Sequence, residues 1–144
     1  MADSLLIWGV SNPLVYSIDS RPIVLIVEHD ATKLRLARRV LESAGFAVSE
    51  ATDAVSTFEA LKTCYPAMIV LDVQLPGMDG WALARRLKSN FATAAIPIII
   101  VTAFGTEADR KYAHAAGCAA FVEKPISSTD LPEIIRQYLA RPPA

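Results

Sequence analysis

The sequence has few cysteines and no excess of basic residues, and these shortages exclude several kinds of protein. Its 2 cysteines, Cys64 and Cys118, lie far apart and lack the CxxC spacing of metal or redox sites, which favours small buried side chains in a reducing compartment. The 14 basic residues against 15 acidic ones give a net charge of −1, without the basic footprint of a nucleic-acid-binding protein. We therefore expect a cytoplasmic protein without a nucleic-acid partner.

A long hydrophobic run is also missing from the start of the chain. Residues 4–10 are mostly apolar but too short to span a bilayer, and Asp3 stands where a secretory signal would carry Lys or Arg. We expect no membrane association and treat residues 1–21 as an N-terminal extension outside the core. Their apolar side chains leave a docked partner segment open as an alternative.

The composition that is present is that of one folded domain. The chain has 144 residues, of which 53% are hydrophobic and 20% charged, so it is long enough to bury a core. From residue 22 onward, short apolar runs alternate with longer amphipathic stretches, which is typical of βα units around a parallel sheet. The expected strands are 23–27, 46–51, 67–71, 96–102 and 119–122, and the expected helices are 31–44, 53–64, 80–89, 107–116 and 127–139.

Polar residues stand where four of the expected strands end. The first strand leads to Glu28, the third to Asp72, the fourth to Thr102 and the fifth to Lys124. Ligands of an open parallel sheet bind outside the carboxyl ends of its strands, so we expect these four side chains to converge on one pocket. An aspartate can accept a phosphoryl group by nucleophilic attack, with a metal ion and an ammonium group offsetting the charge. Asp72 is the candidate nucleophile.

A resemblance to a known family rests on these strand ends. Together they resemble the receiver domain of two-component response regulators, and the segments that carry this resemblance are Val27–Asp30, Leu71–Gly80, Val101–Ala103 and Lys124–Pro125. The resemblance implies an α/β fold with a five-stranded parallel sheet of strand order 2-1-3-4-5 and helices on both faces. We expect this receiver domain to cover residues 22–141, with a short tail at 142–144.

The resemblance also implies partners. The phosphoryl group would come from a sensor histidine kinase or a phosphotransfer protein, and Asp72 would undergo at most self-phosphorylation and autodephosphorylation, without further enzymatic activity. Because no second domain is expected, the signal would pass to a separate, unknown downstream protein or through homodimerisation. The surface that changes would be formed by the fourth helix, the fifth strand and the fifth helix.

Each pocket residue receives a role from the resemblance. Asp72 would accept the phosphoryl group, and Thr102 would donate its hydroxyl to a phosphoryl oxygen. Lys124 would pair first with Asp72 and then with the phosphoryl oxygen, aimed inward by a cis peptide bond before Pro125. Phe121 would rotate together with Thr102, forming a two-state switch whose population phosphorylation shifts.

The expected metal site departs from the family pattern. The resemblance implies Mg²⁺ bound by Glu28, Asp72 and the backbone carbonyl of Gln74, but His29 stands where the family has an acid that binds the metal directly. Mg²⁺ prefers oxygen ligands, whereas imidazole suits softer ions such as Mn²⁺ or Zn²⁺. We therefore expect weakened Mg²⁺ binding, with Mn²⁺ as an alternative.

Three consequences of His29 stay open. Glu28 or Asp30 could bind Mg²⁺ directly in its place, although Asp30 is better placed to cap the following helix. His29 could instead bind a transition metal. Alternatively, a protonated His29 could sit against Asp72 as a cation in a metal-free site.

Two functions follow from these alternatives. Intact Asp72, Thr102 and Lys124 favour a phosphoryl-accepting receiver, whereas His29 favours a degenerate pseudo-receiver that acts as a phosphorylation-independent interaction module. Two other classes fit poorly. A hydrolase of the haloacid dehalogenase type needs a second aspartate where Gln74 stands, and a flavodoxin needs a Ser/Thr/Gly-rich phosphate loop where this chain is acidic.

Overall fold

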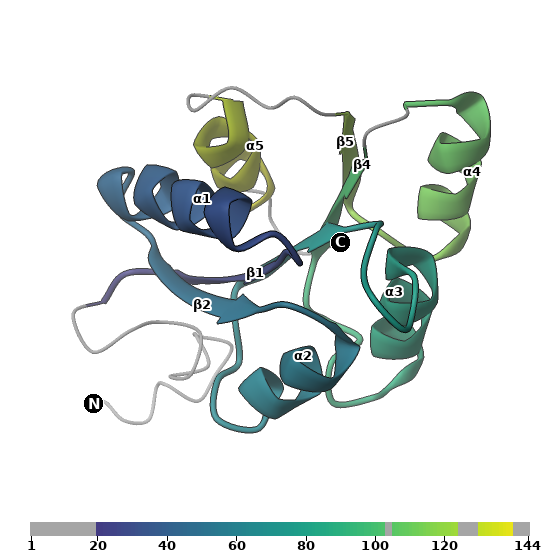
Figure 1. Ribbon diagram of the computed structural model, residues 1–144, viewed down its shortest axis with the longest axis horizontal. Helices are drawn as coiled ribbons and strands as arrows, with labels where there is room; N and C mark the ends of the chain where they lie inside the picture. The colour runs from purple at the N-terminus through teal and green to yellow at the C-terminus, as the bar shows by residue number, and fades with distance from the viewer. Residues whose placement is uncertain (1–19, 103–104, 124–129, 140–144) are drawn as a thin grey trace.

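Strands and helices alternate along the parts of the chain that the computed structural model describes, which are residues 20–102, 105–123 and 130–139. This alternation confirms the predicted βα repeat (Figure 1). In chain order the elements are β1 (Ile23–Val27), α1 (Ala31–Ser43), β2 (Ala47–Ala51), α2 (Ala54–Leu61), β3 (Met68–Asp72), α3 (Gly80–Ser89), β4 (Ile98–Thr102), α4 (Glu107–Ala115), β5 (Ala120–Glu123) and α5 (Asp130–Leu139).

The strands form one parallel sheet in the order β2-β1-β3-β4-β5, as the resemblance implied. Every residue of β3 and β4 is buried, whereas the edge strands β2 and β5 are mostly half-buried. Strands covered by helices on both faces need apolar side chains along their whole length, which explains the Val- and Ile-rich runs in the sequence.

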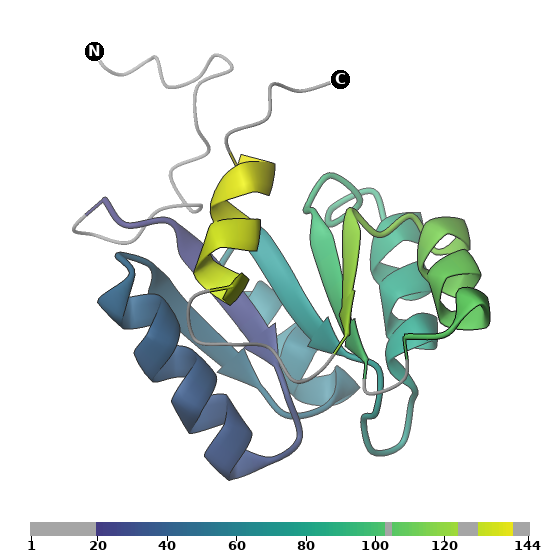
Figure 2. The ribbon, with the colours of Figure 1, turned by 90° about the horizontal axis from the view of Figure 1, so that it is seen from above.

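Helices cover both faces of this sheet and create two cores (Figure 2). In β1, Leu25 and Val27 share a core with residues of α2 and α3, while Val24 and Ile26 share the opposite core with residues of α1 and α5. Successive side chains of a strand point to opposite faces, so each central strand contributes to both cores. Each fully buried aliphatic side chain contributes about 1.5–3 kcal/mol to stability.

Capping residues lie where helices begin and end. The Asp30 side chain accepts a hydrogen bond of 2.9 Å from the Lys33 amide, which confirms Asp30 as the cap of α1. The Thr106 hydroxyl accepts one of 3.0 Å from the Asp109 amide at the start of α4. Gly45, which follows α1, has a φ of +98°, a conformation that favours glycine.

Two of the described element boundaries differ from the prediction by more than one residue. α2 ends at Leu61 instead of residue 64, because the amides of Lys62 and Thr63 bond three residues back and tighten the last turn. β4 begins at Ile98 instead of residue 96, because Pro97 has no amide hydrogen for the strand ladder. The predicted start of the last helix at residues 127–128 lies outside the described residues.

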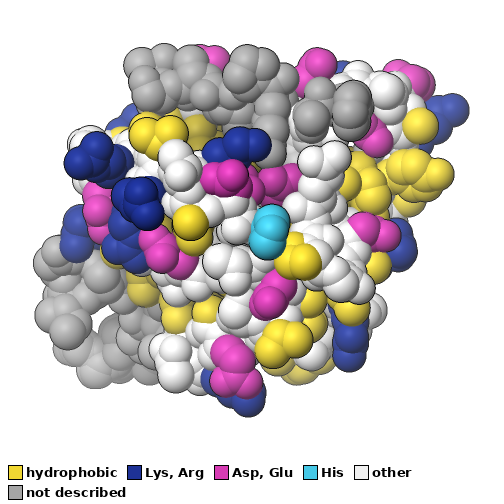
Figure 3. Space-filling view, viewed as in Figure 1, with side chains coloured by type: hydrophobic (Ala, Val, Ile, Leu, Met, Phe, Trp, Pro, Cys, Tyr) yellow, Lys and Arg dark blue, Asp and Glu magenta, His cyan; other side chains and the backbone are white. Residues whose placement is uncertain are grey.

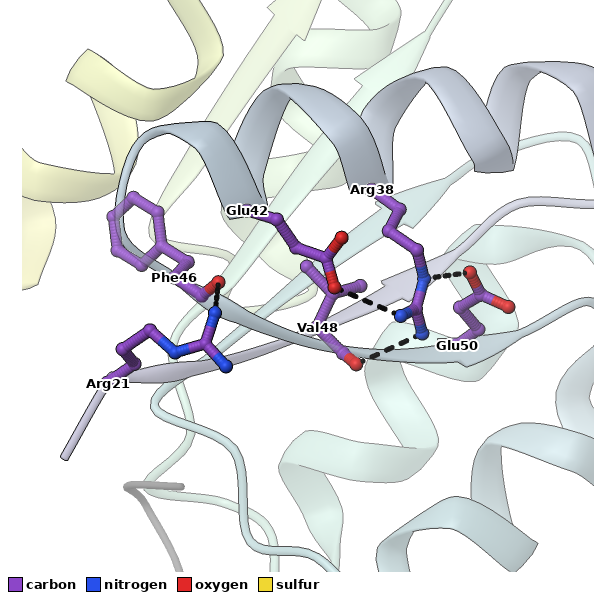
Figure 4. Close-up of polar contacts among 6 residues, drawn as sticks. All are labelled: Arg21, Arg38, Glu42, Phe46, Val48 and Glu50. Atoms are coloured by element: carbon purple, nitrogen blue, oxygen red, sulfur yellow. Dashed lines mark hydrogen bonds and ion pairs between the residues drawn. The ribbon is translucent and has the colours of Figure 1, made fainter. Parts of the chain in front are cut away.

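Arg38 links α1 to the edge strand β2 (Figure 4). Its guanidinium donates to Glu50 Oε2 at 2.6 Å, to Glu42 Oε2 at 3.1 Å and to the Val48 carbonyl at 3.2 Å. The hydrogen bond to Glu50, followed by the nearby negative charges, raises the pKa of Arg38. Because these side chains are more than a third exposed, the contacts position the strand more than they stabilise the fold.

The predicted domain limits at residues 22 and 141 stay predictions, because residues 1–19 and 140–144 lie outside the described residues. Among the helices that are described, none combines the length and the apolar character that a membrane crossing requires.

Gly80 packs against the backbone at the end of β3. Its amide donates to the Val73 carbonyl at 2.7 Å. A Cβ atom added to Gly80 would lie 2.5 Å from the Asp72 carbonyl oxygen and 2.6 Å from the Val73 Cα. A glycine at this position therefore lets α3 begin directly beside the strand end that carries Asp72.

We predict that Gly80→Ala destabilises the protein by about 1–3 kcal/mol, because the new methyl group would overlap backbone atoms that cannot turn aside. Denaturant unfolding of both proteins measures this difference. Gly105→Ala is the matched control, since the three atoms nearest to its added Cβ all belong to the flexible Glu123 side chain. Equal stabilities of wild type and Gly80→Ala would contradict this account of the contact.

Candidate functional site

The parallel register brings the ends of three neighbouring strands to one edge of the sheet. In this register, Val27 of β1 pairs with Leu71 of β3, and Asp72 of β3 pairs with Val101 of β4. Glu28 therefore follows β1 at the level of Asp72, and Thr102 lies one residue further along β4. Because neighbouring strands lie about 4.8 Å apart, Asp72 stands between Glu28 and Thr102.

Asp72 is a buried carboxylate at the end of an apolar strand, with 6% of the residue exposed. Burying a charge is costly unless the charge is hydrogen-bonded. The loop after β3 meets part of this need, because the Gln74 amide donates to Asp72 Oδ1 at 2.9 Å. The fold thus fixes one carboxylate oxygen of the predicted nucleophile and places Gln74 beside it.

Thr102 is also buried, with 3% exposed, and its hydroxyl donates to Asp109 Oδ2 on α4 at 3.3 Å. Sequence reasoning missed Asp109. The spacing of Thr106 and Asp109 signals the start of a helix, but no local pattern shows that the carboxylate turns toward the end of β4. The contact depends on how α4 packs against the sheet.

Phe121 lies half-buried on β5, the strand on which it was predicted. The guanidinium carbon of Arg110 on α4 lies 5.0 Å from the centroid of its ring, within the range of a cation–π contact. Its role as a switch stays a prediction. Sequence reasoning missed Arg110, since α4 and β5 meet only in the folded chain.

Lys124 and Pro125, with the cis bond implied between residues 124 and 125, lie outside the described residues. Their roles therefore stay predictions. Glu123, which precedes them, is paired with Thr102 in the register of β4 and β5. The described backbone thus leads β5 to the same edge of the sheet as Thr102 and Asp72.

His29 lies exposed after β1, near two carboxylates. Hydrogen bonds from the Ser56 amide and hydroxyl lower the pKa of the Asp53 carboxyl, and the nearby His29 adds to this effect. The Lys33 amide lowers the pKa of Asp30, with a smaller contribution in the same direction from His29. Figure 3, drawn in the same view as Figure 1, shows a histidine side chain with acidic side chains close to it. Sequence reasoning did not place Asp53, the cap of α2, near His29.

The predicted metal donors are few but chemically suitable. Among the described residues, no three side chains of His, Cys, Asp or Glu gather closely enough to hold a metal ion. Mg²⁺ usually keeps several waters and takes only one or two carboxylates from the protein. The carboxylates of Glu28 and Asp72, at neighbouring strand ends, are of the kind that Mg²⁺ takes, and together with the Gln74 carbonyl they stay predicted ligands.

These features define a class of protein: a doubly wound parallel α/β domain with a buried aspartate at the carboxyl end of its central strand. The chain belongs to the response regulator receiver domain family, whose sequence model matches residues 24–136.

Individual relatives agree with this assignment. Over 116 residues the chain is 31% identical to the polar-differentiation response regulator DivK of Brucella ovis, which covers 81% of this chain and 94% of the relative. A CheY-like receiver domain protein from Methanospirillum hungatei is 26% identical, with a TM-score of 0.77 over 83% of this chain and 94% of that one.

A receiver domain with a bound metal shares the fold. It belongs to a sensor histidine kinase of Pseudomonas aeruginosa, and its structure has a magnesium ion coordinated in the active-site cleft. It is 23% identical, with a TM-score of 0.77 over 85% of this chain and 100% of that one. At this identity the likeness shows the fold alone.

We predict that His29→Ala raises the pKa of the Asp53 carboxyl. The electrostatic interaction with His29 adds to the lowering of the Asp53 pKa that the Ser56 hydrogen bonds cause, so removing the imidazole disfavours the carboxylate. Titration of the carboxyl carbon by NMR at low ionic strength measures the change, and His114→Ala on α4 is the control. An unchanged Asp53 pKa would contradict the placement of His29 beside it.

Proposed function

We propose that this chain is a phosphoryl-accepting receiver that takes a phosphoryl group onto Asp72 from a sensor histidine kinase or a phosphotransfer protein. The single observation that carries the proposal is the buried Asp72 carboxylate, held by the Gln74 amide at the end of the central strand. Glu28 and Thr102 on the neighbouring strand ends supply the polar surroundings that phosphoryl transfer needs.

The transfer itself is a displacement at phosphorus. A carboxylate oxygen of Asp72 attacks the phosphorus of a phosphohistidine, forming a new O–P bond while the P–N bond breaks. The histidine nitrogen keeps the electron pair of the broken bond and takes up a proton from solvent. The Thr102 hydroxyl and the Lys124 ammonium then donate to phosphoryl oxygens.

Metal binding supports this reaction in the proposal. Glu28, Asp72 and the Gln74 carbonyl would hold Mg²⁺, or Mn²⁺ as the alternative. When bound, the ion offsets the repulsion between the carboxylate and the phosphoryl oxygens. In this proposal Glu28 binds the metal without His29, at reduced affinity, because Mg²⁺ prefers oxygen ligands to imidazole.

The proposed output surface is formed by α4, β5 and α5. Thr102 contacts α4, and Phe121 on β5 contacts the same helix through Arg110, so a change at the pocket has a path to this surface. A separate downstream protein or a second copy of the chain would read it. The free cysteines Cys64 and Cys118 are consistent with a reducing cytoplasm.

We predict that incubation with acetyl phosphate and Mg²⁺ or Mn²⁺, or with a phosphorylated histidine kinase, adds one phosphoryl group to the protein. Intact-protein mass spectrometry measures the increment. Asp72→Asn, which keeps the size of the side chain but is a far weaker nucleophile, should show none. If wild type gains no phosphoryl group with either metal or from kinases, the chain is a pseudo-receiver that interacts without phosphorylation.

We predict that His29→Asp strengthens Mg²⁺ binding by about tenfold, because it adds a hard oxygen ligand and a negative charge at the metal site. The phosphorylation yield should rise with it. Calorimetric titration of Mg²⁺ measures the affinity. His114→Asp makes the same chemical change at an exposed position on α4 and should leave the affinity unchanged. Equal or weaker binding in His29→Asp would show that position 29 does not limit the metal site.

A further inference from the structure

The hydroxyl that is proposed to bind the phosphoryl group is engaged elsewhere in this structure. Thr102 donates to Asp109 Oδ2 at 3.3 Å. The Asp109 amide in turn donates to the Thr106 hydroxyl at 3.0 Å, which fixes Asp109 in the first turn of α4. A carboxylate is favoured there by the helix dipole, so Asp109 is a stable acceptor for Thr102.

Helix α4 also makes two contacts with aromatic rings of neighbouring elements. Tyr112 lies with its ring centroid 5.8 Å from that of Trp81 on α3, and Arg110 lies over the ring of Phe121 on β5. Together with the bond from Thr102 to Asp109, these contacts join α4 to three neighbouring elements. A change in the Thr102 bond therefore alters one of the contacts that hold α4 in place.

A threonine hydroxyl carries a single hydrogen that it can donate. Thr102 therefore cannot donate to Asp109 and to a phosphoryl oxygen at the same time. The two acceptors are also both negatively charged, so the Asp109 carboxylate and a phosphoryl group on Asp72 compete for one donor.

We propose that Asp109 is a positioning residue that holds the Thr102 hydroxyl on α4 in the unphosphorylated protein and so opposes phosphoryl binding at Asp72. This inference rests on the proposed phosphoacceptor role of Asp72. The hydrogen bond from Thr102 to Asp109 and the bond from Thr102 to the phosphoryl group exclude one another. By linkage, a phosphoryl group on Asp72 weakens the hydrogen bond from Thr102 to Asp109 by the same factor by which Asp109 weakens phosphoryl binding.

Binding of beryllofluoride, a phosphoryl analogue, in the presence of Mg²⁺ tests the inference in the full chain. Asp109→Ala should bind it about fivefold more tightly than wild type, because the competing acceptor is gone. Glu107→Ala is the matched control: it removes an acid from the same helical turn, where Glu107 lies 4.0 Å from Arg110, and should not change the affinity.

A double-mutant cycle separates the hydrogen bond from a general charge effect. In a Thr102→Val background, Asp109→Ala should give no gain, since no hydroxyl is left to compete for. A fivefold gain that persists in Thr102→Val would contradict the inference and assign the effect to charge repulsion. Circular dichroism of each variant checks that the helices are intact.

The failure of this inference is distinguishable from that of the proposed function. Equal beryllofluoride affinities of wild type and Asp109→Ala would overturn the role of Asp109 while leaving Asp72 as the acceptor. If neither protein binds beryllofluoride and neither is phosphorylated, the phosphoacceptor role of Asp72 is wrong. The competition at Thr102, which depends on that role, is then wrong as well.

Discussion

The parallel register of β1, β3 and β4 is the constraint on which the rest of the molecule depends. It is held by two cores, because alternate side chains of each central strand pack against helices on opposite faces of the sheet. The same register aligns the carboxyl ends of the strands, so that Glu28, Asp72 and Thr102 meet at one edge. A shift of one residue would turn every core side chain of a strand to the wrong face, so the packing of the cores also fixes the pocket.

The pocket and the surface beside it share their supporting contacts. Gly80 lets α3 begin against the backbone of Asp72, and Thr102 joins the end of β4 to Asp109 on α4. A chemical change at Asp72 therefore occurs next to the starts of two helices. Such an arrangement suits a two-state signalling domain, in which a local charge change biases the position of a neighbouring element.

The alternation of strands and helices, the cap residue Asp30 and the position of Asp72 could be predicted from apolar periodicity and cap residues, which are local signals. The strand order came from the resemblance to receiver domains, since no local signal gives the order of strands in a sheet. The start of β4 was predicted two residues early, since the apolar pattern did not register the missing amide of Pro97. The neighbours of the site could not be predicted. Asp109 meets Thr102, and Asp53 lies near His29, only because separate elements pack together.

The central claim is that Asp72, Thr102 and Lys124 act together on one phosphoryl group at this edge of the sheet. A crystal structure of the protein with Mg²⁺ and beryllofluoride tests it most directly. The account predicts the beryllium bonded to a carboxylate oxygen of Asp72, with the Thr102 hydroxyl and the Lys124 ammonium each donating to a fluoride. Beryllofluoride bound elsewhere, or a Lys124 ammonium turned away from Asp72 in that complex, would contradict it.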